Sequence, residues 1–143
     1  RSRKNLTIIT NCLTMAMLVA QQLECHLFCT GGKYNVASAS FVGYSAVKEL
    51  RNWFADIMIF SVNSIDKNNG LTDQGDEIAR VKSVMIEQSK KQILLADSTK
   101  FNRTSNYRLA SISDITNIIT NEDTSFDNSC WNEYRDMMTF VTI

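Results

Sequence analysis

Short apolar runs alternate with longer amphipathic segments along this chain. Apolar runs of this length are too short for helices and are typical of strands buried in a sheet. We therefore predict strands at residues 6–10, 27–30, 57–62, 93–96, 117–120 and 139–143. Apolar residues with the spacing of one helical face predict helices at residues 44–54 and 76–90. Residues 13–23 are apolar nearly all round and predict a helix that packs on more than one side, and a further helix is predicted at 126–136.

Three segments between these elements have no clear period. Residues 33–42 are expected to form a loop that leads into a short extended segment. Residues 64–70 are rich in Asp, Asn and Gly, which favours a turn. Residues 107–115 have a mixed pattern that predicts neither a helix nor a strand.

The order of the predicted elements indicates the fold class. A strand, a helix and a second strand within residues 6–30 form a βαβ unit, whose strands lie parallel with a right-handed crossover. Strands and helices continue to alternate toward the end of the chain. This order predicts an α/β fold with an open, mostly parallel sheet and helices on both faces.

Length and composition narrow the possible functions. The 143 residues suffice for one domain with a real core, and no repeat or linker divides them. The proportions of 44% hydrophobic and 21% charged residues are ordinary for a soluble globular protein. Because 15 basic residues balance 15 acidic ones, the chain by itself is not expected to bind DNA. No apolar run approaches the ~20 residues of a membrane span, so no membrane partner is expected.

The cysteines indicate a compartment and raise the question of a metal site. Cys12, Cys25, Cys29 and Cys130 do not form a disulfide framework, and reduced thiols in a cytoplasmic protein explain them. The spacing of Cys25, His26 and Cys29 suggests metal binding, but alternation along a strand turns His26 away from the two thiols. Since no second Cys/His pair completes four ligands, no metal is expected.

The segment Gln92–Phe101 carries the most distinctive chemistry. Its apolar run ends abruptly in Asp97, two hydroxyl residues and Lys100. In open α/β sheets, ligands bind just outside the carboxyl ends of the strands. Asp97 could there accept sugar hydroxyl groups, and Lys100 could face an anion. The alternative is a solvated turn in which both side chains only cap the structure that follows.

Three stretches taken together resemble a known protein family. They are Ile8-Ile9-Thr10-Asn11, Gly70-Leu71-Thr72 and the block from Leu94 to Phe101. Their order and spacing resemble the DeoR family of bacterial transcription regulators, over essentially the whole chain. Supporting matches are Gly31-Gly32, Phe41-Val42-Gly43, Asp56 and the pattern Ala79-x-x-Lys82-x-x-Met85-Ile86.

The resemblance implies the C-terminal effector-sensing domain of such a regulator, over residues 1–143. Its fold would be similar to ribose-phosphate isomerase and CoA-transferase domains. The implied effector is a phosphorylated sugar, no cofactor is implied, and most members repress genes of sugar metabolism. Operator DNA would be bound by an N-terminal helix-turn-helix domain, which we expect to be absent here together with the first strand and phosphate loop of the sensing domain. A homo-oligomer is expected because DNA half-sites require at least a dimer.

The first implied ligand residues lie in the N-terminal third of the chain. Thr10 and Asn11 match a Thr-Asn pair at a strand end, where free backbone N–H groups would bind an anion. Asn11 could equally be only the N-cap of the next helix. Gly31 and Gly32 would let a ligand approach the backbone closely, or would simply form a tight turn.

The other implied ligand residues are Thr72, Lys82, Asp97 and Lys100. Thr72 would offer a hydroxyl group or cap the following helix, and Lys82 on that helix would face the ligand or solvent. Asp97 and Lys100 are the leading candidates. Lys100 would act as a point charge toward phosphate, and Asp97 as a hydroxyl acceptor or as the group that orients the lysine.

Two other functions fit the same fold. A sugar-phosphate isomerase would need a base beside the substrate, for which Asp97, Glu77 and His26 are candidates, but no convincing acid partner is present. A domain kept only for oligomerisation would also fit, because Ile78 stands where the family usually has an acidic residue. We therefore expect a sensor and not an enzyme.

Overall fold

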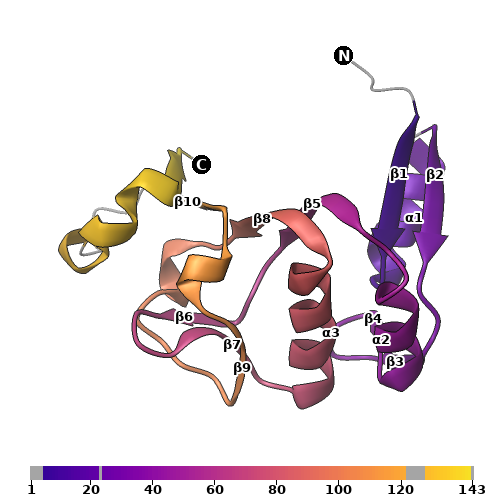
Figure 1. The fold of residues 1–143 in the computed structure, drawn as a ribbon, viewed down its shortest axis with the longest axis horizontal. Coiled ribbons are helices and arrows are strands. Elements are labelled where there is room, and N and C mark those ends of the chain that lie inside the picture. Colours follow the sequence, from indigo (N-terminus) through magenta and orange to yellow (C-terminus); the bar gives the residue numbers. More distant parts are fainter. Residues whose placement is uncertain (1–4, 23, 122–127, 143) are drawn as a thin grey trace. The chain divides into compact units, whose positions relative to one another are not determined.

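The structure, a computed structural model, describes residues 5–22, 24–121 and 128–142. It separates into two compact units, which are Arg1–Trp53 (unit 1) and Phe54–Ile143 (unit 2) (Figure 1). Each unit has its own strands and helices. The assignment of residues 1–143 to one sensing domain stays a prediction.

Unit 1 contains the predicted βαβ unit. Its elements are β1 (Leu6–Thr10), α1 (Leu13–Gln22), β2 (Cys25–Cys29), β3 (Lys33–Asn35), β4 (Ser40–Val42) and α2 (Tyr44–Leu50). β1 and β2 pair in parallel with α1 as their connection, and β3 and β4 form an antiparallel hairpin. The short extended segment expected at the end of 33–42 agrees with β4, whereas β3 replaces the start of the expected loop.

Unit 2 combines a parallel and an antiparallel sheet. Its strands are β5 (Ala55–Phe60), β6 (Ser64–Asp66), β7 (Gly70–Asp73), β8 (Ser89–Leu95), β9 (Tyr107–Ala110), β10 (Asn117–Asn121) and β11 (Met138–Val141). Its helices are α3 (Asp76–Glu87) and the 3-10 helices η1 (Ser98–Lys100), η2 (Ile112–Asp114) and η3 (Asn128–Met137). The parallel sheet has the order β11-β10-β8-β5, and the antiparallel sheet has the order β6-β7-β9.

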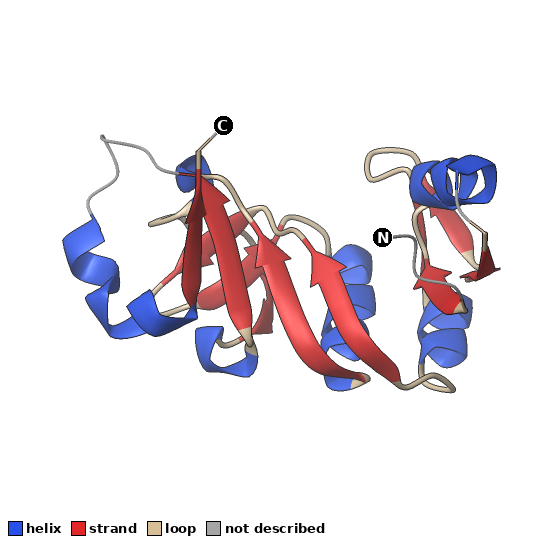
Figure 2. Cartoon of the chain, turned by 90° about the horizontal axis from the view of Figure 1, so that it is seen from above, coloured by secondary structure: helices blue, strands red, loops and turns tan. Residues whose placement is uncertain are grey.

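Parallel pairing brings the carboxyl ends of the four strands to one edge of the sheet. Figure 2 shows their arrows running the same way. Leu95 of β8 lies beside Ile119 of β10, and Leu94 lies between Phe60 of β5 and Ile118 of β10. The expected α/β fold with a mostly parallel sheet is thereby confirmed.

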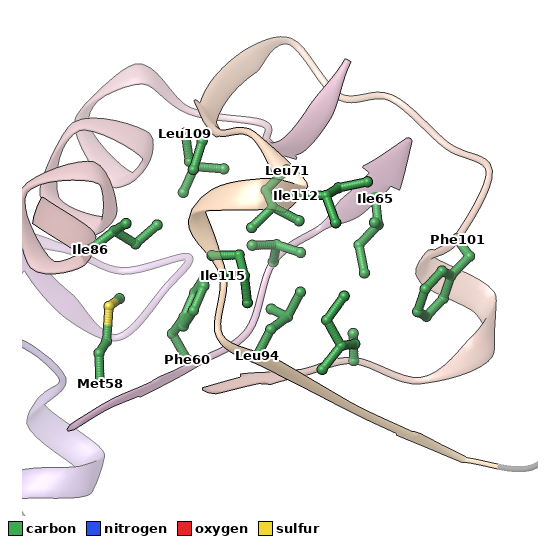
Figure 3. Close-up of a cluster of buried hydrophobic side chains, with 14 of the residues drawn as sticks. Met58, Phe60, Ile65, Leu71, Ile86, Leu94, Phe101, Leu109, Ile112 and Ile115 are labelled. Carbon is green, nitrogen blue, oxygen red and sulfur yellow. The ribbon is translucent and has the colours of Figure 1, made fainter. Parts of the chain in front are cut away.

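The core of unit 2 lies on one face of the parallel sheet (Figure 3). Leu94 and Ile118 of that sheet are fully buried, as are Ile65 and Leu71 of the antiparallel sheet. α3 adds small and branched side chains to this cluster, and Trp131 of η3 is buried against it. The opposite face differs from the expectation of strands covered on both sides, because its apolar side chains Ile57, Ile59, Leu95 and Val141 are exposed.

Several element boundaries differ from the predictions. Residues 64–70, expected as a turn, are the hairpin of β6 and β7, since burial of Ile65 and Leu71 outweighs the weak strand propensity of Asp, Asn and Gly. The helix expected to reach residue 90 ends at Glu87, because Ser89 already pairs with Ala55 of β5. The helix expected at 44–54 ends at Leu50. The described part of 126–136 is 3-10 helix, and 107–115 forms β9 and η2.

Candidate ligand site at the strand ends

A hollow of about 320 Å³ lies at the carboxyl ends of the parallel strands in unit 2. This volume is near the lower limit of small-molecule pockets. Its polar lining comes from three strand ends: Ser61 follows β5, Asp97 follows β8, and Asn121 ends β10. Leu95 and Val141 add apolar surface to it. This is the edge of the sheet at which the sequence predicted a site.

Asp97 lines the hollow and also caps η1. Its Oδ1 accepts the backbone N–H of Thr99 at 2.9 Å and also the Thr99 hydroxyl. The donated hydroxyl holds the pKa of Asp97 below its ordinary value; partial burial opposes this shift, and the Thr99 N–H and the charge of Lys100 support it. The carboxylate is therefore ionised at neutral pH and can only accept hydrogen bonds. The capping alternative and an exposed acceptor are both compatible with this geometry.

Lys100 ends the same 3-10 turn, three residues after Asp97. Its side chain is half-buried, and it forms no ion pair with any residue that the structure describes. Lys82, Lys67 and Lys90 do form ion pairs, so their charges are already engaged. Lys100 thus keeps its charge available for an anion near the turn that Asp97 caps.

Lys82 is engaged inside unit 2. Its Nζ donates to Oδ2 of Asp73 at 2.7 Å and to the carbonyl oxygen of Ser61 at 2.7 Å. Asp73 is buried, and its other oxygen accepts the N–H of Asn63 at 2.8 Å. The ion pair therefore fixes the chain that follows β5, including Ser61 of the hollow. Lys82 therefore acts on the hollow only indirectly, through its hydrogen bond to the carbonyl oxygen of Ser61.

Thr72 is buried, and its hydroxyl is used within unit 2. Its Oγ1 accepts the N–H of Ser105 at 2.8 Å, and the hydroxyl of Ser105 lies 2.8 Å from that of Ser64. These contacts hold the loop before β9 against the β6–β7 hairpin. Thr72 does not line the described hollow, and its role toward a ligand stays a prediction.

In unit 1, Thr10 ends β1 and Asn11 follows it, before α1 begins at Leu13, as predicted. The Thr10 hydroxyl accepts the N–H of Cys12 at 3.1 Å, and Asn11 Nδ2 donates to the carbonyl of Phe41 at 2.9 Å. Asn11 also accepts the Phe41 N–H through its backbone carbonyl at 2.7 Å. The capping role suggested for Asn11 is therefore wrong, because its side chain donates to β4, and the first helical hydrogen bond runs from the Ala16 N–H to the carbonyl oxygen of Cys12.

The two glycines after β2 differ in the space that a side chain would have. Gly32 has φ +130°, and a Cβ there would lie 2.6 Å from the carbonyl oxygen of Val42, so the fold itself requires glycine. A Cβ on Gly31 would meet no atom within 4 Å. Packing within unit 1 therefore requires glycine at Gly32 and not at Gly31, and the ligand role of both residues stays a prediction.

The predicted residues fall into one set in each unit. In unit 2, Asp97 lines the hollow and caps η1, and Lys100 ends that turn. Lys82 donates to the carbonyl of Ser61, and Thr72 is not part of the hollow's lining. In unit 1, Thr10, Asn11, Gly31 and Gly32 stand at the carboxyl ends of β1 and β2.

Sequence reasoning missed Ser61 and Asn121, which line the hollow. For Asn121 the signal was present, because a strand was predicted up to residue 120 and ligands bind beyond strand ends. Ser61 fell inside the strand predicted for 57–62, whereas β5 ends at Phe60. It also missed two buried threonines at strand ends, Thr30 and Thr120, whose Oγ1 atoms have no hydrogen-bond partner within the described residues.

Neither a metal-ligating cluster nor a membrane-spanning helix is found among the described residues. Within residues 5–22, 24–121 and 128–142, no three His, Cys, Asp or Glu side chains gather as a metal site would require. Among the described helices, none has the length and apolar character needed to cross a membrane.

Relatives of the chain are transcription regulators. The uncharacterized HTH-type transcriptional regulator YulB of Bacillus subtilis is 31% identical over 137 residues, which are 96% of this chain and 52% of that protein. The L-fucose operon activator of Haemophilus influenzae is 29% identical over 94% of this chain and 54% of its own length. The HTH-type transcriptional repressor GlcR of Bacillus subtilis is 31% identical over 80% of this chain and 44% of its own length. The chain spans about half the length of the curated relatives it matches.

A family model supports the same assignment. The description "DeoR C terminal sensor domain" applies to the model that matches residues 1–122. The match contains both candidate sets of residues and the strand ends that carry them. The chain therefore belongs to the family of DeoR C-terminal sensor domains.

Proposed function

We propose that this domain binds a phosphorylated sugar and thereby controls a repressor of sugar-metabolism genes. The observation that carries the proposal is an ionised acceptor that lines the hollow, Asp97, followed on the same 3-10 turn by Lys100, which forms no ion pair with a described residue. A sugar phosphate needs both kinds of group, since its hydroxyls donate hydrogen bonds and its phosphate seeks a cation.

The relatives support a role in the regulation of sugar genes, but they differ in whether they activate or repress transcription. One is named an activator of the L-fucose operon, and another is named a repressor. For this chain we propose repression, a cytoplasmic location, a homo-oligomeric protein and operator binding through a separate helix-turn-helix domain. Effector and operator would then have to favour different states of the protein, because otherwise binding would not be coupled.

A sugar-phosphate isomerase is the alternative from a different class. A general base works best when its pKa lies near the working pH, whereas the pKa of Asp97 is lowered. Glu77 lies in the first turn of α3 and is not part of the hollow's lining. His26 lies within β2 of unit 1. The sensor is better supported because it needs only binding groups.

A thermal-shift screen of the natural protein that contains this chain tests the proposal. The compounds are hexose, pentose and amino-sugar phosphates, including glucose 6-phosphate and fructose 1-phosphate, with the free sugars alongside. A ligand that binds only the folded state raises the unfolding temperature by mass action. We expect a shift for one sugar phosphate that is absent for its free sugar and lost in Lys100→Ala.

The matched control is Lys91→Ala. Lys91 is an exposed lysine near the amino end of β8, whereas Lys100 lies in η1 after the carboxyl end of that strand. It should leave the shift unchanged. If no sugar phosphate stabilises the folded wild-type protein, the sensor proposal is wrong and an oligomerisation domain is the better account. Turnover of a sugar phosphate would instead establish the isomerase.

A further inference from the structure

The side-chain amide of Asn121 is held in one orientation at the hollow. Its Oδ1 accepts the N–H of Ser98 at 2.8 Å. Because a backbone N–H can only donate, the atom facing it must be the amide oxygen, and the other end must be Nδ2. Nδ2 makes a contact with Ser98 Oγ at 3.5 Å, which is long for a hydrogen bond.

This arrangement leaves Asn121 with donor capacity. An amide nitrogen carries two N–H groups, and only the long Ser98 contact uses one of them among the residues that the structure describes. The side chain is half-buried, and Asn121 lines the hollow. The Ser98 link thus fixes a hydrogen-bond donor in the wall of the site.

Donor and acceptor stand on neighbouring strand ends. Asp97 follows β8 and Asn121 ends β10, and these two strands pair directly. Asp97 only accepts, while Asn121 Nδ2 only donates. A hydroxyl group does both, so the hydroxyls of a sugar satisfy both side chains. A phosphate in the same place would bring its negative charge to the Asp97 carboxylate.

The apolar part of the hollow also fits the hydroxylated end of a sugar phosphate better than its phosphate group. Leu95 is 43% exposed and Val141 is 41% exposed, and both line the hollow. The C–H face of a sugar ring would remove this apolar surface from water, whereas a phosphate group would not.

We propose that Asn121 is a specificity-determining residue that donates a hydrogen bond to a ligand hydroxyl. The hydroxylated end of the effector lies in the hollow against Asn121 and Asp97, and its phosphate lies toward Lys100. This inference rests on the proposed function and adds the orientation of the ligand.

The deciding variant is Asn121→Asp in the natural protein that contains this chain. A carboxylate of the same shape still accepts the Ser98 N–H, but it cannot donate. We expect an unchanged unfolding temperature without ligand. The Kd of the sugar phosphate that stabilises the wild type, measured by calorimetry, should rise about tenfold or more.

Asn117→Asp is the matched control, because it makes the same chemical change at the other end of β10. Asn117 Nδ2 donates to Thr139 Oγ1 at 3.3 Å, away from the hollow's lining. Its Kd should equal the wild-type value. A wild-type Kd for Asn121→Asp would overturn the inference while leaving the proposed function intact. Absence of any wild-type binding would overturn both.

A second measurement covers the case in which Asn121→Asp is destabilised. A crystal structure of the wild type with the same sugar phosphate supports the inference if a ligand hydroxyl lies within hydrogen-bond distance of Nδ2. A phosphate group in the hollow overturns it.

Discussion

The acidity of Asp97 depends on one neighbouring hydroxyl. Thr99→Val removes the largest cause of the lowered pKa, so the pKa of Asp97 should rise toward its ordinary value. A carboxyl whose pKa is lower in the folded state adds stability above its unfolded pKa of about 3.9. That stability is lost as pH falls through the folded pKa. NMR titration of the Asp97 carboxyl carbon measures the change, and Thr104→Val in the following loop should leave it unaltered. An unshifted titration in Thr99→Val would contradict the assigned cause.

The Lys82–Asp73 pair should be a large single contributor to the stability of unit 2. Lys82→Met leaves the carboxylate of Asp73 buried without its cation, at 2% exposure. Losing one partner of a fully buried pair costs about 3–5 kcal/mol, and the 25% exposure of Lys82 reduces this to about 2–3 kcal/mol. Urea unfolding measures the difference.

Two further variants isolate the charge effect. Asp73→Asn combined with Lys82→Met should recover part of the lost stability, because no charge is then buried alone. Lys90→Met breaks only the exposed pair with Asp56 and should cause no measurable change. Equal effects of Lys82→Met and Lys90→Met would show that burial of Asp73 is unimportant.

At the residue scale, the sequence predicted the groups that follow an abrupt change in polarity. Asp97 and Lys100 come directly after an apolar run; Asp97 lines the hollow, and Lys100 ends the 3-10 turn that Asp97 caps. Asn121 follows the less apolar stretch 117–120, and its side-chain amide is oriented by the N–H of Ser98. That contact joins residues far apart in the chain, so no local pattern reveals it.

At the scale of elements, the turn after β2 allows a direct comparison of two adjacent glycines. Gly32→Ala should destabilise the protein by about 1–3 kcal/mol, because of its positive φ and the clash of a Cβ with Val42. Gly31→Ala should leave the unliganded protein unchanged, since the added methyl group meets open space. Thermal unfolding of both variants checks this.

The same pair tests the ligand role of Gly31. If a ligand approaches this backbone, Gly31→Ala lowers the affinity for the sugar phosphate without lowering stability. An unchanged affinity would leave Gly31 outside the site. A destabilised Gly31→Ala would show that packing within unit 1 needs the glycine.

Element prediction succeeded where periodicity was strong and local. The strand 6–10 agrees with β1 to the residue, and the helix predicted from residue 13 begins there as α1. The β6–β7 hairpin was missed because turn-forming residues surround Ile65 and Leu71, whose burial comes from the rest of unit 2. Tertiary packing, which the local sequence does not contain, decided that case.

At the scale of the molecule, the chain consists of two units whose apolar surfaces differ from the simple expectation. The sequence predicted strands covered on both faces, but β5, β8 and β11 carry exposed Ile57, Ile59, Leu95 and Val141 on one face of their sheet. An apolar run predicts that its side chains are shielded from water. It does not predict which segment or subunit shields them.

The parallel register of unit 2 has a consequence for the rate at which a bound state forms and decays. Ala55 pairs with Ser89, and Asn117 pairs with Ile93, so each contact closes a long loop. Such non-local pairing slows folding, and the hollow does not exist before the strand ends have met. An effector that binds there stabilises contacts made late in folding. It should therefore prolong the lifetime of the native state and leave the rate of its formation unchanged.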